Sequence, residues 1–182
     1  MRKHHYHWLG VAALLVLTLS CGEKKKESDV IIAKKVEQKV PKSIQGMSEY
    51  VDSRQTEWVG SVYTVEVKRR KDPSLPVVTL GDKTRYYDNR ISVKVIRKDG
   101  SVFFNKDFTK ADFSGHLDAH TQEQGALLGV VFVKAEGNDL LFAASVGSPD
   151  MASDEYVPLV VRLSRMGNIS ITQDTILDTE NE

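Results

Sequence analysis

The chain has 182 residues, with 25 basic and 25 acidic side chains and a formal net charge of zero at neutral pH. Hydrophobic residues make up 41% of it, which is typical of a globular protein and not of a wholly disordered chain. Balanced charge argues against a dedicated nucleic-acid-binding protein, which is usually basic, so we expect no nucleic-acid partner. The single cysteine excludes an internal disulfide framework and any metal cluster held by several thiolates.

Residues 1–20 are predicted to be a secretory signal peptide. Arg2 and Lys3 precede an apolar run over residues 8–19. A helix of that length would measure about 18 Å at ~1.5 Å per residue, which is too short to cross a hydrocarbon core of about 30 Å. The run ends in Ser20-Cys21-Gly22, which resembles a bacterial lipobox. We therefore predict cleavage before Cys21 and a lipid on Cys21 that anchors the protein in a membrane.

Residues 21–56 are predicted to be a lipidated flexible tether, because they are polar and contain Tyr50 as their only aromatic residue. Within this segment Ile32, Val36 and Val40 lie four residues apart, as on one face of a short helix. Two interpretations remain open here. The stripe docks on the domain or on the bilayer, or the segment is a solvated tether with transient helix.

Residues 57–182 are predicted to form a single all-β domain. Short β-branched and aromatic runs alternate with turn signals, a pattern typical of an antiparallel meander or Greek key closed as a barrel or sandwich. The one helical candidate covers residues 110–120. The eight predicted strands cover residues 59–68, 77–80, 91–97, 102–108, 126–135, 140–146, 157–164 and 169–173.

Two hairpins carry specific structural expectations. Asp99-Gly100 is predicted to be a two-residue type I′ turn, which pairs Val95 with Phe104, Ile91 with Phe108 and Ile96 with Phe103. The hairpin over residues 126–146 is apolar on both faces, so it needs a cover on its outer side at Val131 and Val133. We expect residues 110–120 to supply that cover through Phe113 and Leu117.

A ligand site is predicted around an aromatic cluster with one carboxylate. Tyr and Trp suit a binding mouth because the ring is apolar at one end and donates a hydrogen bond at the other. The alternative is that these rings pack in the core or decorate strand faces. The candidate residues are Trp58, Tyr86, Tyr87, Asp88 and Tyr156.

Catalytic and metal chemistry find little support in the residue pattern. No Gly-x-Ser-x-Gly motif is present. His116 and His120 share one face whether the segment is a helix or a strand, and on a strand Asp118 joins them. The three are weak metal candidates, because two imidazoles and a carboxylate can hold zinc; two solvated histidines are the simpler interpretation. We expect no catalytic residues, no cofactor and no enzymatic activity. The alternatives are a hydrolase that uses carboxylates or a His-bound metal, and a calycin-like barrel for an apolar ligand.

Five short stretches together resemble a known family. They are DPSLP at 72–76, YYDNR at 86–90, DGSVFF at 99–104, FTK at 108–110 and DEYVPL at 154–159. In their order and spacing the chain resembles the uncharacterised Bacteroides-type lipoprotein family known as domain of unknown function 4738, over residues 58–179. The resemblance implies a lipidated envelope protein and supplies no catalytic residues.

Taken together, the sequence predicts an outer-membrane lipoprotein of the bacterial cell envelope, facing the periplasm or the cell surface. The predicted activity is that of a non-enzymatic binding or structural module. Its expected partners are the membrane, through the N-terminal lipid, and a protein, glycan or small molecule of unknown identity.

Lipidation is tested by the Cys21→Ala variant. Because the thiol is the acceptor for the lipid, we expect the variant to leave the membrane fraction or to remain unprocessed. Cell fractionation followed by mass spectrometry of the N-terminus measures both outcomes. Unchanged processing and unchanged membrane retention would contradict the prediction.

Overall fold

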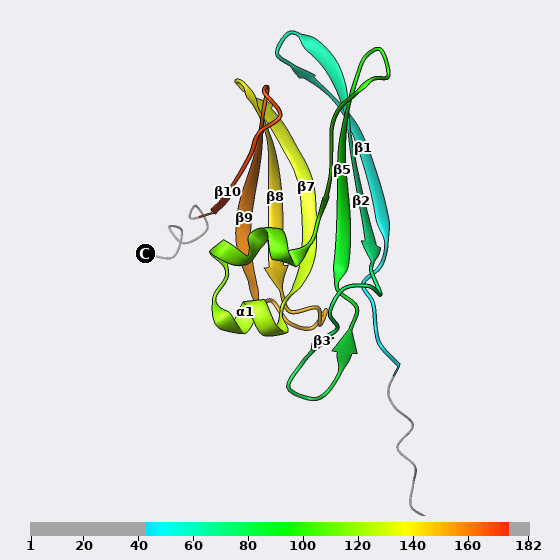
Figure 1. Cartoon of the computed structure of the whole chain (residues 1–182), viewed down its shortest axis with the longest axis vertical. Coiled ribbons are helices and arrows are strands. Elements are labelled where there is room, and N and C mark those ends of the chain that lie inside the picture. The colour runs from blue at the N-terminus through cyan, green and yellow to red at the C-terminus, as the bar shows by residue number, and fades with distance from the viewer. Residues whose placement is uncertain (1–42, 175–182) are drawn as a thin grey trace, which may run out of the picture. The chain divides into compact units, whose positions relative to one another are not determined.

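Two four-stranded antiparallel sheets pack against each other in the computed structural model, which describes residues 43–174 (Figure 1). The first sheet has the order β1-β2-β5-β6 and the second the order β10-β9-β8-β7. A ribbon of β3 and β4 and two short helices, η1 and α1, complete this part of the chain. The antiparallel all-β prediction is therefore confirmed. The fold is sandwich-like, so the alternative of a calycin-like closed barrel is wrong.

The strands of the first sheet are β1 (Tyr50–Trp58), β2 (Ser61–Lys71), β5 (Asn89–Arg97) and β6 (Val102–Phe108). Those of the second sheet are β7 (Ala126–Glu136), β8 (Asp139–Gly147), β9 (Tyr156–Ser164) and β10 (Ile169–Gln173). The ribbon consists of β3 (Val78–Thr79) and β4 (Arg85–Tyr86), and the helices are η1 (Lys110–His116) and α1 (Ala119–Gln124).

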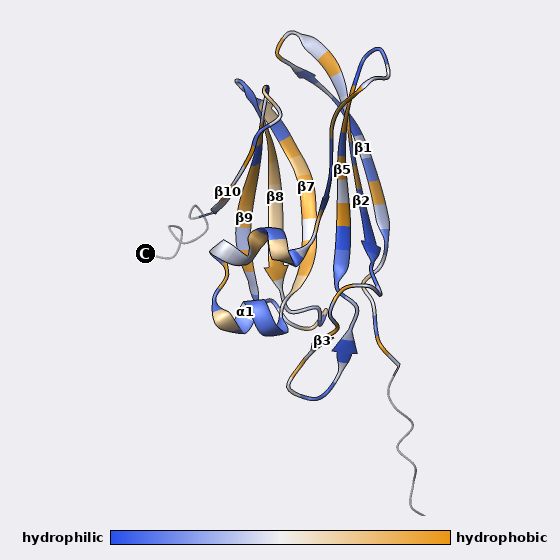
Figure 2. Cartoon of the chain, in the orientation of Figure 1, coloured by the Kyte–Doolittle hydropathy of each residue, from blue (hydrophilic) through white to orange (hydrophobic). Residues whose placement is uncertain are grey.

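The core lies between the two sheets and consists of alternate residues of their strands. In β5, Ile91, Val93 and Val95 point inward and are buried. Alternation gives a strand one apolar face, and burial of each such side chain contributes about 1.5–3 kcal/mol. The second sheet is the more apolar of the two, and β7 carries a nearly continuous apolar stretch (Figure 2). Its core residues include Leu127, Val130, Phe132, Leu140, Phe142, Leu159, Val161 and Leu163.

The first strand begins inside the segment predicted to be a tether. Residues 50–56 pair with β2 as part of β1, so a tether that extends to residue 56 is wrong. β1 is an edge strand. Its residues Asp52 and Arg54 pair with the buried Val67 and Val65 of β2, and the two side chains form an ion pair of 2.8 Å with each other. Such a strand lacks the apolar alternation by which half-buried strands are predicted. Cys21 and the rest of residues 1–42 lie outside the described residues.

The β5–β6 hairpin has the predicted register except next to its turn. The pairs of Ile91 with Phe108 and Val95 with Phe104 are confirmed. The register then shifts, so Ile96 pairs with Val102 and the predicted pair with Phe103 is wrong.

The turn of this hairpin is not type I′. The Gly100 N–H donates to the Arg97 carbonyl at 2.9 Å, and among residues 97–101 only Gly100 has a positive φ, of 85°. A type I′ turn needs positive φ at both central residues. The loop is therefore longer than two residues, and the register shift accommodates it.

The predicted helix over residues 110–120 is divided into η1 and α1. The division occurs at Asp118, whose carboxylate accepts a hydrogen bond from the Thr121 N–H at 2.8 Å and caps α1. No helix within residues 43–174 is both long enough and apolar enough to span a bilayer.

Residues 110–120 do not cover the outer face of the β7–β8 hairpin, so that prediction is wrong. Phe113 and Leu117 are buried in the core instead, where the Phe113 ring lies 5.9 Å from that of Phe108. Val131 and Val133 remain 41% and 53% exposed. β7 has two register shifts against β8, and such irregularities interrupt the simple alternation of a strand. Its apolar run therefore does not imply two covered faces.

One side of the sandwich is closed by side chains of the first sheet that bond to the edge strand β7. Tyr50 Oη donates to the Val130 carbonyl at 3.0 Å, and Arg69 Nη1 donates to the Leu128 carbonyl at 2.5 Å. Burial raises the pKa of Tyr50. These bonds satisfy carbonyls that no neighbouring strand reaches.

The opposite side is closed by η1, which lies between β6 and β10. Lys106 of β6 forms an ion pair of 2.8 Å with Asp112 of η1. Gln173 of β10 donates through Nε2 to the His116 carbonyl at 2.8 Å. The helix thus connects the two sheets along the edges formed by β6 and β10.

Substitution of Phe113 tests the position of η1 in the core. Phe113→Ala removes a fully buried ring, so we expect the free energy of unfolding to fall by about 3–5 kcal/mol. Val133→Ala is the control, because that side chain is half exposed and its loss is expected to cost about 0.5 kcal/mol or less. Urea unfolding measures both. Equal losses in the two variants would contradict the assignment of Phe113 to the core.

Candidate functional site

The five residues predicted to line one ligand site do not come together. Trp58 lies at the β1–β2 hairpin, where it is buried and packs edge-on against Tyr63 and Phe103, with ring centroids 5.1 and 5.3 Å away. The other four candidates lie near the first residues of β5 and β9, at the opposite end of the sandwich (Figure 1). The assignment of Trp58 to the ligand site is therefore wrong, because its ring belongs to the core.

Tyr86 and Tyr87 also have structural roles. Tyr86 is buried in a small second core with Val78 and Ala126. The Tyr87 N–H donates to the Gln45 carbonyl at 2.9 Å, which fixes the residues ahead of β1 against the ribbon. Neither tyrosine lines either of the two hollows described below, whereas Asp88 and Tyr156 each line one of them.

The larger hollow has a volume of about 580 Å³ and lies between α1 and the first residues of β9; we call it the α1–β9 hollow. Among the residues that line it are His120 and Gln124 of α1, and Glu155 and Tyr156. Tyr156 is 50% exposed. No described residue hydrogen-bonds to these four side chains, so their polar atoms are open to a ligand.

Two glycines allow the backbones around this hollow to approach each other. A Cβ on Gly147 would lie 2.2 Å from the Glu155 carbonyl oxygen and 2.5 Å from the Tyr156 Cα. A Cβ on Gly125 would lie 2.5 Å from the Thr121 carbonyl oxygen. Both positions therefore favour glycine, Gly147 because the β9 backbone lies close to it and Gly125 because the last turn of α1 does.

The three weak metal candidates do not converge. Asp118 and His120 line the α1–β9 hollow, but His116 ends η1 and does not line it. Both Asp118 oxygens accept from Thr121, from its N–H at 2.8 Å and its Oγ1 at 2.9 Å, and these bonds lower the pKa of Asp118. Within the described part of the chain, no three metal-ligating side chains gather at one point.

The smaller hollow has a volume of about 280 Å³ and lies between the residues leading into β3, η1 and α1; we call it the β3–η1 hollow. Its walls are mainly apolar, and Asp88 and Lys110 line it together. Sequence reasoning missed Lys110, because a lysine at the start of a predicted helix has no distinguishing signal.

Asp88 and Asn89 form a clamp on Leu127, the second residue of β7. Asp88 Oδ1 accepts from the Leu127 N–H at 2.9 Å and from the Asn89 N–H at 2.7 Å. Asn89 Nδ2 donates to the Leu127 carbonyl at 2.9 Å. Asp88 is only 3% exposed, and burial raises the pKa of its carboxyl despite these bonds and the nearby Lys110 charge.

Lys110 holds the last residues of α1 in place. Its Nζ donates to the Gln122 and Gly125 carbonyls, each at 2.7 Å. Partial burial lowers the pKa of Lys110, and the Asp88 carboxylate opposes that effect. The ammonium therefore joins η1 to α1 across the β3–η1 hollow.

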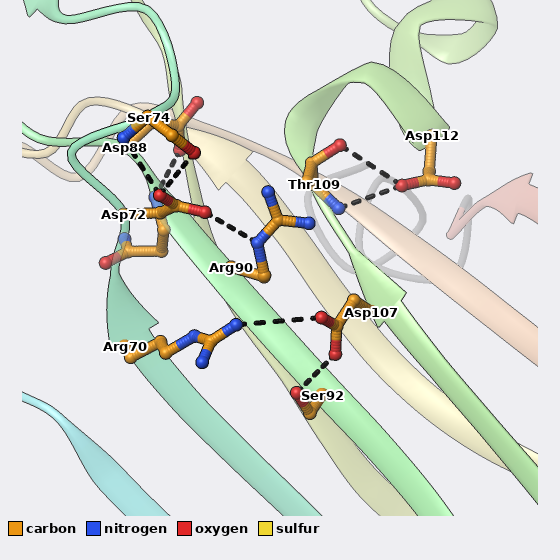
Figure 3. A network of polar contacts seen from close by, with 10 residues as sticks. Arg70, Asp72, Ser74, Asp88, Arg90, Ser92, Asp107, Thr109 and Asp112 are labelled. Atoms are coloured by element: carbon orange, nitrogen blue, oxygen red, sulfur yellow. Dashed lines mark hydrogen bonds and ion pairs between the residues drawn. The ribbon is translucent and has the colours of Figure 1, made fainter.

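The outer side of β5 carries a polar network (Figure 3). Arg90 Nε bonds to Asp72 Oδ2 at 2.6 Å, and Asp72 Oδ1 accepts from the Ser74 Oγ at 2.6 Å and the Ser74 N–H at 2.9 Å. The bonds from Ser74, followed by that from Arg90, lower the pKa of Asp72 to about 2. Arg70 pairs with Asp107 at 3.7 Å beside it. This network fixes the turn after β2 against β5.

The fold and its hollows define a class of protein: a small antiparallel β-sandwich domain with two ligand-sized hollows at one end, one on each side of a short helix. The chain belongs to the family described as domain of unknown function DUF4738, whose sequence model matches residues 31–171. No curated protein sequence matches the chain. The match confirms the resemblance to domain of unknown function 4738, whereas the lipoprotein character stays a prediction. The matched region begins ahead of β1.

Asp88→Asn tests the burial of the Asp88 charge. Asparagine keeps the Oδ1 acceptor of the clamp but cannot ionise. In the wild type, ionisation above the ordinary pKa of about 3.9 costs the folded state more than the unfolded state, so this cost grows as the pH rises through the raised pKa. We therefore expect the stability of the variant, relative to wild type, to increase with pH from about 3.9 up to the raised pKa of Asp88 and to stay constant above it.

Urea unfolding at a series of pH values measures this difference. Asp154→Asn is the control, because Asp154 is exposed and lies outside both hollows. A difference between Asp88→Asn and wild type that does not change with pH would contradict the assignment.

Proposed function

We propose that the protein is a lipid-anchored binding module of the bacterial cell envelope. In this proposal the α1–β9 hollow binds a hydroxyl-rich ligand of the glycan class, and no reaction is catalysed. The N-terminal signal pattern and Cys21 support the anchor. The proposal further locates the protein in the outer membrane, facing the periplasm or the cell surface. The geometry of the hollow supports the binding function.

The single observation that carries the binding proposal is the position of Tyr156. Tyr156 is half exposed and lines a hollow of about 580 Å³, together with the open side chains of His120, Gln124 and Glu155. An aromatic ring packs against the C–H face of a sugar, while polar side chains bond to its hydroxyls. A few placed polar groups around a concave surface are the usual composition of a ligand site.

A hydrolase would need more than this hollow supplies. Carboxylate catalysis uses a pair of acids, one of which donates a proton while the other acts as base or nucleophile. Of the two carboxylates that line the α1–β9 hollow, Asp118 has both oxygens bonded to Thr121. Glu155 alone is open, and this favours binding over hydrolysis.

Tyr156→Ala tests the proposal. A panel of neutral oligosaccharides is screened by thermal shift against the purified protein. Binding to the folded state raises its stability by about 2.7 kcal/mol at a ligand concentration of 100 Kd. We expect at least one oligosaccharide to raise the Tm of the wild type and not that of Tyr156→Ala, which loses the aromatic surface.

Met151→Ala is the matched control, since Met151 is fully exposed near Glu155 in sequence but does not line the hollow. Its Tm shift is expected to equal that of wild type. The proposal fails if no oligosaccharide stabilises the wild type, or if the shift survives in Tyr156→Ala.

A further inference from the structure

We propose that the β3–η1 hollow is a second binding site, which takes a small neutral molecule with a compact apolar body and a hydroxyl or primary amide head held by Asp88 and Lys110. This site is distinct from the α1–β9 hollow, so the inference goes beyond the function proposed above and does not depend on it.

The walls of the hollow suit an apolar body. Leu75, Pro76, Val77 and Val78 form one side, and Leu117 lies on the side of η1. An apolar cavity of about 150 Å³ holds benzene. A hollow of about 280 Å³ therefore has room for a ring with a short polar substituent.

Asp88 offers an acceptor that the fold does not use. Its Oδ1 accepts both backbone hydrogen bonds of the clamp, and no described residue donates to Oδ2. Asp88 as a whole is only 3% exposed, but Oδ2 is not one of the fully buried atoms without a partner among the described residues, and Asp88 lines the hollow, so this oxygen opens onto it. The clamp needs one oxygen acceptor, which an asparagine would also supply, so the second oxygen is free to accept from a ligand in the hollow.

Lys110 offers a donor on the wall of the same hollow, although no ion pair joins it to Asp88. An ammonium has three N–H groups, and two of those on Lys110 are used by the Gln122 and Gly125 carbonyls. A hydroxyl or a primary amide both donates and accepts, so one such group satisfies Asp88 and Lys110 together.

The charge balance of the site favours a neutral ligand. The Asp88 carboxylate and the Lys110 ammonium compensate each other, and burial raises the pKa of the first and lowers that of the second. The remaining charged residue of the hollow, Glu123, is exposed to solvent. A charged ligand would bring an uncompensated charge into a partly buried site, which is unfavourable.

The probe is benzyl alcohol, and toluene serves as the same ring without the polar head. Both are titrated against the full protein while backbone amide resonances are followed by NMR. We expect benzyl alcohol to shift the amides of Val77, Ala111 and Ser114 saturably, with an affinity at least about tenfold above that of toluene, because hydrogen bonds to charged groups are the stronger ones.

Two variants test the roles of the residues. Asp88→Asn keeps the clamp acceptor and removes the second carboxylate oxygen, so we expect about tenfold weaker binding of benzyl alcohol and little preference over toluene. Ala111→Trp adds bulk at an exposed position on the rim, and we expect it to abolish binding of both probes without loss of folding. Tyr156→Ala is the control and is expected to bind benzyl alcohol as the wild type does.

The proposal is overturned if benzyl alcohol causes no saturable shift in the wild type, or if its shifts centre on His120 and Tyr156. It is also overturned if toluene binds the wild type as tightly as benzyl alcohol, or if Ala111→Trp binds unchanged. A failure of every oligosaccharide in the Tyr156 experiment leaves these outcomes unaffected, so the two proposals fail separately.

Discussion

Two adjacent side chains, Asp88 and Asn89, fix the first residues of β7 to the first residues of β5. The Leu127 N–H donates to Asp88, and the Leu127 carbonyl accepts from Asn89. β7 is an edge strand of its sheet, and a buried backbone group without a partner costs about 1–3 kcal/mol. Asp88 and Asn89 therefore satisfy the backbone N–H and carbonyl of Leu127, as a neighbouring strand would. The same two bonds connect the two sheets.

The clamp also explains why both hollows lie at one end of the molecule. Asp88 follows the β3–β4 ribbon directly, and Leu127 follows α1 after a short connection. Once these two residues are bonded, the ribbon and the helices must lie next to each other, and Lys110 secures α1 through two backbone carbonyls. The concave surfaces are thus a result of the same interactions that hold the sheets together.

Much of the fold could be predicted from the sequence, because its signals are local. β5 alternates buried and less buried residues, and glycine at the turn beside it is visible in the chain. β1 could not be predicted, since its inward positions include Asp52 and Arg54, and an edge strand beside a polar lead-in looks like a tether.

The candidate site was less accessible to prediction for a different reason. Asp88 and Tyr156 were identified individually from residue type, but only the packing of α1 assigns them to separate hollows. The role of Lys110 depends on two carbonyl groups contributed by residues more than ten positions away. Trp58 was misassigned because a core ring and a binding ring have the same residue type, and their burial alone distinguishes them.

The order of the strands has a consequence for how the chain acquires its structure. Every strand of the first sheet precedes every strand of the second along the sequence, and each sheet pairs only with itself. Loop closure is slower the farther apart the paired segments lie, and most strand pairing here joins segments that are close in the sequence. We expect each sheet to assemble independently as the chain emerges, with the step that joins them, at Leu127, occurring last. Until then both apolar faces are exposed, and this is the stage at which such a chain is most prone to aggregate.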